Sequence, residues 1–186
     1  MSIFGGMKLV QLLKRSLAGI LAGGLVIFAG CQKQAESAPP PAGAIDFSEP
    51  QAAQPKLRTV KLWLGPEQLD AEMCVTPQET RTGMMFRKSM DENDGMIFSL
   101  GYNQQASFWM KNCFVPLSVA YISPDGVIEE IHPLQPQDTT PVVSATNNIR
   151  FALETRQGWF DRHHVTTGMV VRTEKGSLME TFGQSQ

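Results

Sequence analysis

The sequence predicts a compact α+β domain that is rich in mostly antiparallel β-strands, partly barrel-like, with about two short helices. Three observations indicate this class. Apolar residues mostly alternate with polar ones, which is the period of a half-buried strand. Short apolar segments are separated by turn residues, and two segments carry helix signals. No internal repeat is visible, and residues 57–175 have the length of a single domain.

Strands are expected where apolar residues alternate with polar ones or form short runs. In 60–64 the aliphatic residues take alternate positions, and Gly65-Pro66 marks a bend before the alternating segment 69–76. Ser-Pro-Asp-Gly at 123–126 has the residues of a tight turn, so the strands on either side should form a hairpin. The other expected strands cover 96–100, 107–112, 117–122, 127–131, 148–155 and 169–172.

Helix signals occur at two places. Thr76 and Glu79 have the spacing of a capping box, and Pro77 stands at the first helical position. We therefore expect a helix from Pro77 to about Phe86. A second, shorter helical turn is expected over 158–164.

The N-terminus predicts an exported lipoprotein. A basic start precedes an apolar stretch, 17–29, and small residues stand directly before Cys31. This pattern is typical of an export signal. A cysteine at that point resembles the bacterial lipobox, whose thiol accepts acyl chains such as palmitate. We expect a signal peptide at 1–30 and lipidation of Cys31. A retained anchor and plain secretion are the alternatives, but the apolar stretch is shorter than the roughly 20 residues that span a bilayer.

The expected location follows from the residues after this cysteine. Gln32 rather than aspartate follows it, so by analogy with lipoprotein sorting we expect the periplasmic face of the outer membrane in a diderm bacterium. Residues 31–56 are rich in proline and alanine without apolar periodicity, which predicts a disordered tether. Residues 176–186 are expected to be a flexible tail.

The charge of the mature chain narrows the class of partner. The leader holds three of the 16 basic residues and none of the 18 acidic ones, which leaves 13 − 18 = −5. An acidic chain without a basic run argues against nucleic acid and against electrostatic adhesion to anionic lipid. The expected partners are the membrane, through the lipid, and an unknown small ligand or envelope protein.

Four motifs of the domain carry a family resemblance. In order they are TPQETRTGMMFR at 76–87, DGMIF at 94–98, FWMKN at 108–112 with VPL following at 115–117, and GWF at 158–160. Together they resemble the domain-of-unknown-function 192 family, also called uncharacterised protein family 0127, over about residues 61–172. The resemblance implies a small β-rich α+β domain and no assigned function. The chain departs from the family at Cys113, where threonine is common, and in the 135–144 loop, which lacks the cysteine pair of many members.

A ligand site is the leading hypothesis for these motifs. The expected helix is flanked by Arg81 and Arg87, and the expected strand 107–112 presents Trp109 and Lys111 on one face and Asn112 on the other. If the three cations converge, they would form a pocket walled by Trp109 and suited to a carboxylate, phosphate or acidic sugar.

The alternative is a purely structural role for the same residues. Each arginine would then pair with a nearby acid such as Glu79, Asp94 or Glu154, while Trp109 and Phe108 would fill the core.

Signals for enzymes, cofactors and metals are weak. The three histidines, His132, His163 and His164, lack the spacing of metal ligands, and no serine-nucleophile motif is present, so we assign no catalytic residue, metal or cofactor. A nucleophile pair of Cys113 with His132 stays conceivable. Several methionines lie within residues 84–110, and because thioethers suit Cu(I), a copper site is a further hypothesis. Methionine more commonly fills irregular cores.

Two alternatives stay open at this stage. Once Cys31 is acylated, Cys74 and Cys113 are an even pair in an oxidising compartment, and they form either a disulfide or two separate, partly buried thiols. The function favoured is a lipid-anchored envelope protein with a non-catalytic module that binds a small anionic or carbohydrate ligand or a protein partner. The alternative is a hydrolase-like enzyme that uses the Arg81, Arg87 and Lys111 cluster.

Overall fold

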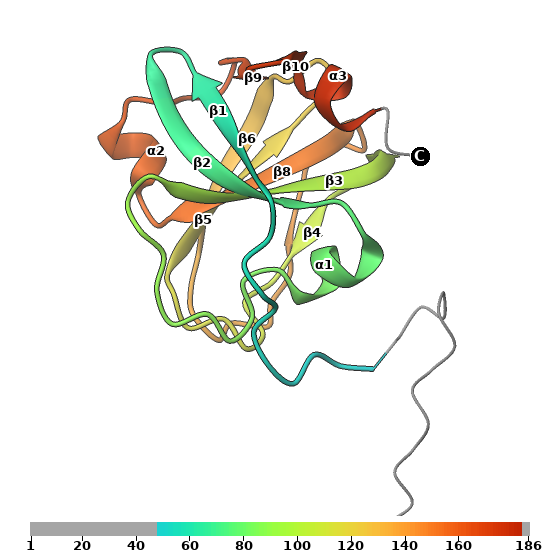
Figure 1. Cartoon of the computed structure of the whole chain (residues 1–186), viewed down its shortest axis with the longest axis vertical. Coiled ribbons are helices and arrows are strands. Elements are labelled where there is room, and N and C mark those ends of the chain that lie inside the picture. The colour runs from blue at the N-terminus through green and yellow to red at the C-terminus, as the bar shows by residue number, and fades with distance from the viewer. Residues whose placement is uncertain (1–47, 184–186) are drawn as a thin grey trace, which may run out of the picture. The chain divides into compact units, whose positions relative to one another are not determined.

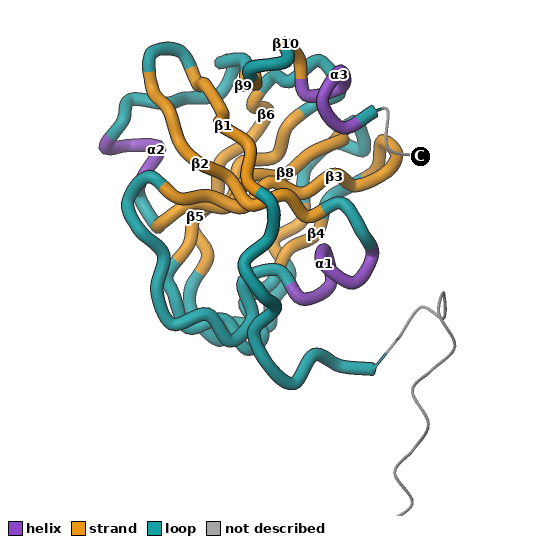
Figure 2. The backbone as a smooth tube through the Cα atoms, in the orientation of Figure 1, coloured by secondary structure: helices purple, strands orange, loops and turns teal. Residues whose placement is uncertain are grey.

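The computed structural model describes residues 48–183, which form a β-rich domain with three short helices (Figures 1 and 2). The strands are β1 (Thr59–Leu64), β2 (Glu67–Cys74), β3 (Asp94–Gln104), β4 (Ser107–Phe108), β5 (Leu117–Ile122), β6 (Ile128–Leu134), β7 (Val142–Val143), β8 (Ile149–Arg156), β9 (Val171–Thr173) and β10 (Gly176–Ser177). The helices are α1 (Pro77–Thr82), α2 (Trp159–Arg162) and α3 (Leu178–Phe182). The predicted α+β class is confirmed.

One eight-stranded sheet dominates the described residues, in the order β10-β9-β1-β2-β3-β8-β5-β6, and β4 pairs with β7 apart from it. The pairs are antiparallel except β2 and β3, which α1 and its flanking loops connect. The strand order has two ends, so the sheet is not closed into a barrel. A single bridge between Val127 and Val170 joins the segments that lead into β6 and β9.

Both faces of the sheet are covered, and each carries its own apolar cluster. In β5, Leu117, Val119 and Tyr121 pack on one face while Ala120 and Ile122 pack on the other. This alternation is the period of two that predicted the strands. Central strands in such a sheet are buried on both sides, so any polar side chain they carry must also be buried.

The capping box forms as predicted, but α1 ends earlier than expected. The Thr76 side chain accepts a hydrogen bond from the Glu79 backbone N–H, and the Glu79 carboxylate accepts in return from the Thr76 N–H. The helix stops at Thr82 because Gly83 and Phe86 have positive φ angles of 46° and 62°. The prediction that it reaches Phe86 was therefore wrong.

The expected strand over 107–112 is shorter than predicted. Pairing with β7 is limited to Ser107 and Phe108. Beyond them the chain turns: the Cys113 N–H donates to the Met110 carbonyl, and Asn112 has a φ of 57°. The two faces assigned to this segment from sequence therefore do not exist beyond Phe108.

The domain extends beyond both predicted boundaries. Residues 48–56, predicted as part of the tether, lie against the domain, where the Gln54 amide donates to the carbonyls of Glu79 (3.3 Å) and Gly83 (2.9 Å). At the other end the predicted tail from 176 forms β10 and α3. Its Phe182 side chain is buried against Phe151, with ring centroids 5.7 Å apart. The sequence did not predict these contacts, because residues 48–56 contain prolines and the segment from 176 has polar residues around its few apolar ones.

The remaining predictions about the N-terminus lie outside the described residues. They are the signal peptide, the lipidation of Cys31 and the tether up to residue 47. Within residues 48–183, every helix is too short and too polar to cross a bilayer.

Helix α3 is expected to stabilise the domain. Phe182→Ala removes a ring that is 3% exposed, and a buried phenylalanine truncation costs about 3–5 kcal/mol. Met179→Ala, on the same helix but 39% exposed, is the matched control and should change stability by less than about 0.5 kcal/mol. Urea denaturation of the full chain measures both. Equal, small effects would show that α3 does not belong to the cooperative core.

Candidate functional site

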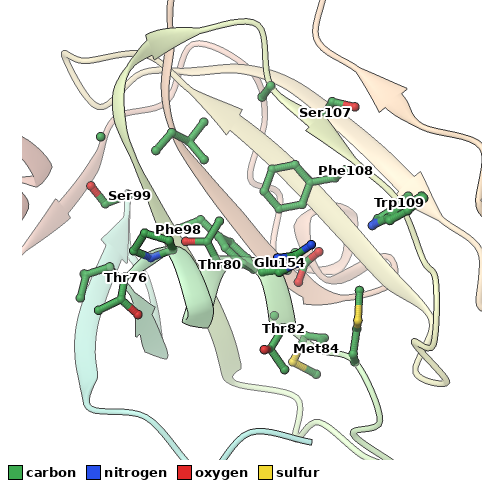
Figure 3. Close-up of a pocket in the computed structure, with 18 of the residues that line it drawn as sticks. Thr76, Thr80, Thr82, Met84, Phe98, Ser99, Ser107, Phe108, Trp109 and Glu154 are labelled. Atoms are coloured by element: carbon green, nitrogen blue, oxygen red, sulfur yellow. The ribbon is translucent and has the colours of Figure 1, made fainter. Parts of the chain in front are cut away.

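A cavity of about 730 Å³ opens on the face of the sheet that carries α1 (Figure 3). Its walls come from residues 49–50 before β1, from α1 and the loop after it, from β3 and from β4 with Trp109. Cavities of this size hold small molecules.

A distortion of β3 forms one wall of this cavity. The strand pairs with β8 up to Ser99, loses register, and pairs again only at Gln104. Gly101 takes a positive φ of 81° at this point, a conformation that glycine adopts without strain. The segment in between, including the 68%-exposed Tyr102, borders the cavity instead of extending the ladder.

Aromatic rings and neutral polar groups form about half of the remaining lining, and aliphatic and sulfur-containing side chains such as Met84 and Met85 form much of the rest. The Phe98 and Phe108 rings meet edge to face at 5.0 Å, and the Tyr121 ring lies 5.9 Å behind Phe108. Trp109 also lines the cavity and is 44% exposed, so it does not fill the core. Hydroxyl and amide groups are supplied by Thr76, Thr80, Ser99, Gln104, Gln105 and Ser107.

The three predicted cations do not share one site. Arg81 lines the cavity. The Arg87 guanidinium instead forms a two-pronged pair with Glu72, at 2.8 Å and 3.1 Å, and also donates to the Pro55 carbonyl. The three cations therefore do not converge as predicted. Arg87 is paired with an acid, which was the alternative interpretation.

Lys111 is held at the rim by an acid from the N-terminal segment. Its Nζ lies 2.6 Å from a Glu49 carboxylate oxygen and 5.6 Å from the centroid of the Trp109 ring. Hydrogen bonding to Lys111, followed by its charge, holds the pKa of Glu49 below its usual value, and Arg81 adds a smaller effect in the same direction. The positive charges near the cavity mouth thus already have an acidic neighbour.

Asn112 helps to hold the loops beside the cavity together, and it does so through its backbone. Its positive φ lets its carbonyl accept a hydrogen bond from the Phe86 N–H at 2.8 Å, which fastens the loop after α1 to the loop after β4. Of the five residues predicted from sequence to bind a ligand, Arg81 and Trp109 line the cavity.

Sequence analysis missed Glu154 as a site residue. It lies in the second half of β8, opposite Met96 of β3 and Val119 of β5, and its side chain borders the cavity (Figure 3). The residue is 4% exposed, and its Oε2 atom has no hydrogen-bond partner among the described residues. Burial raises the pKa of this carboxyl to about 8, so it is mostly protonated at neutral pH.

The charge of Glu154 acts on two thiols and a phenol. Burial first, and the Glu154 charge second, raise the pKa values of Cys74, Cys113 and Tyr121, that of Cys113 to about 12. Both cysteines are buried free thiols, so of the two possibilities left open from sequence the structure has the separate thiols rather than the disulfide.

The nucleophile pair of Cys113 with His132, and a metal site built from His, Cys or carboxylate side chains, find no support in this geometry. A nucleophilic cysteine needs a lowered pKa, whereas that of Cys113 is raised, and His132 contacts Glu130 at 2.8 Å. Across residues 48–183, no group of three or more His, Cys, Asp or Glu side chains has the arrangement of a metal site.

The fold and cavity define a small β-rich α+β domain with an amphipathic, concave site. The model of the DUF192 family, described as "Uncharacterized ACR", matches residues 60–173. The chain therefore belongs to this family, as its four motifs predicted.

Solved structures of two bacterial proteins are similar to this chain. One, from Sinorhizobium meliloti 1021 and described as "a putative transcription regulator", shares 27% identity with a TM-score of 0.62 and covers 65% of this chain and 98% of its own. The other, from Novosphingobium aromaticivorans DSM 12444 and described as of unknown function, shares 28% identity with a TM-score of 0.61 and covers 65% and 91%. The curated proteins compared with the chain gave no match.

Proposed function

We propose that the domain is a binding module for a small carbohydrate or similarly sized polar ring compound, carried on a lipid-anchored envelope protein. The cavity of about 730 Å³, with aromatic rings and neutral hydroxyl and amide groups in its lining, is the observation that supports this most directly. Sugars present apolar ring faces that pack on aromatic side chains and hydroxyls that exchange hydrogen bonds, so this lining suits them.

The charges around the cavity favour a carbohydrate ligand over a small anionic ligand, the two classes that the sequence predicted. Arg87 is paired with Glu72, and Lys111 with Glu49. Among the described residues that line the cavity, Arg81 is the single cation, and its charge already acts on Glu49. An anionic ligand would meet little net attraction in such a lining.

One observation supports an enzyme as the second candidate. An acid with a raised pKa in a cavity is typical of a proton donor, and Glu154 has both properties. The hydrolase-like alternative, however, relied on a cluster of Arg81, Arg87 and Lys111 that does not assemble. The Oε2 atom of Glu154 has no hydrogen-bond partner among the described residues, so no second acid or base is seen to act with it there, and we place binding first.

Binding is expected to depend on Trp109. Trp109→Ala should raise the Kd for short glucose and N-acetylglucosamine oligosaccharides at least tenfold, because the stacking surface is lost. A tenfold change in Kd corresponds to about 1.4 kcal/mol of binding free energy. Phe114→Ala, which removes a ring that is 51% exposed and outside the cavity, is the matched control. Isothermal titration calorimetry on the full chain in mild detergent measures both, with glucuronate and inorganic phosphate as anionic probes. Equal binding by both variants, or binding of the anions alone, would contradict the proposal.

Membrane attachment is expected to depend on Cys31. In cells fed labelled palmitate, the wild-type chain should carry the label and fractionate with membranes, whereas Cys31→Ser should lose both properties. Cys113→Ser is the control, because its thiol is buried in the domain and should leave labelling unchanged. Unlabelled wild-type protein, or a Cys31→Ser chain that stays in the membrane fraction, would contradict lipid anchoring.

A further inference from the structure

The floor of the cavity holds an acid without a counter-charge. Glu154 is more than nine-tenths buried and borders the cavity, and its Oε2 atom has no hydrogen-bond partner among the described residues. Burial alone accounts for its raised pKa, and no cation of the domain lowers it. An unpaired polar group at such a depth is costly, and the domain itself does not compensate for it.

The neighbours of Glu154 do not supply a counter-charge. Cys74, Cys113 and Tyr121 all have raised pKa values, so at neutral pH each is uncharged. Arg81, a cation that lines the cavity, is exposed and acts on Glu49. A charged partner for this carboxylate therefore has to come with the ligand.

Two features of the cavity favour a cationic group in that position. A carboxylate that accepts a hydrogen bond from an ammonium group gains a charge-assisted interaction, which is stronger in a buried site than in water. The faces of aromatic rings also attract cations, and the Phe98 and Phe108 rings belong to the same lining. Figure 3 shows Glu154 in the middle of the view, with Phe108 and Trp109 to one side and Thr82 and Met84 to the other.

We propose that the cavity recognises an organic ammonium group, carried on a sugar ring, through a charge-assisted hydrogen bond to the Glu154 carboxylate. This inference rests on the proposed carbohydrate-binding function and narrows its ligand to an amino sugar. On binding, the Glu154 carboxyl releases its proton to solvent and the ligand ammonium takes over as hydrogen-bond donor. No covalent bond changes.

The test uses two probes that differ in their amines alone: the glucosamine trimer and its fully N-acetylated counterpart. At about pH 6 the sugar amines are protonated, and calorimetry on the full chain should give at least tenfold tighter binding of the glucosamine trimer. Glu154→Gln should abolish this preference, because an amide has no charge to pair with the amine. Glu129→Gln, which alters an exposed acid outside the cavity, should retain it.

A second readout does not depend on the variant folding. Binding of the glucosamine trimer to the wild-type chain should release up to one proton, seen as a difference in heat between buffers of different ionisation enthalpy. The acetylated trimer should release none. Equal affinities for the two trimers, a preference that survives in Glu154→Gln, or no proton release would overturn the inference while leaving carbohydrate binding intact. Failure of both trimers to bind would overturn the proposed function as well.

Discussion

The central place of β8 in the sheet is the constraint on which the rest of the structure depends. It pairs with β3 along one edge and with β5 along the other, and apolar clusters cover both of its faces. Its side chains from Ile149 to Thr155 are therefore buried, and only Arg156 at its end is exposed. The fold thus buries Glu154 and at the same time places it in the lining of the cavity, one wall of which is the distorted part of β3.

This arrangement has a thermodynamic consequence for the whole domain. The carboxyl of Glu154 has a folded-state pKa of about 8 against a reference value of 4.5. Between these pH values the folded chain keeps a proton that the unfolded chain has lost, so stability falls as pH rises through this window, by at most about 1.4 kcal/mol per pH unit. A residue that lowers stability at neutral pH, in the wall of a cavity, is better explained by a role in the site than by packing.

Sequence analysis predicted the class of fold, the positions of the main strands and the capping box of α1, because these depend on local periodicity and on residues three apart. It failed where distant segments decide the outcome. The strand over 107–112 ended early because the 135–144 loop supplies the carbonyl of Asp138 to the Met110 N–H. The cluster of Arg81, Arg87 and Lys111 did not form because Glu72 and Glu49, far away in the chain, pair with two of its members. Glu154 had a weak signal, a lone acid among apolar residues, but only the sheet order shows that its strand is central.

The central claim is that Glu154 is a buried acid that stays protonated at neutral pH in the unliganded domain. Carbon-13 NMR of glutamate carboxyl groups in the full chain tests it directly, with the Glu154 signal assigned by its loss in Glu154→Gln. The account predicts a titration midpoint of about 8 for this carboxyl. A midpoint near 4.5, the ordinary value for a solvated glutamate, would contradict it.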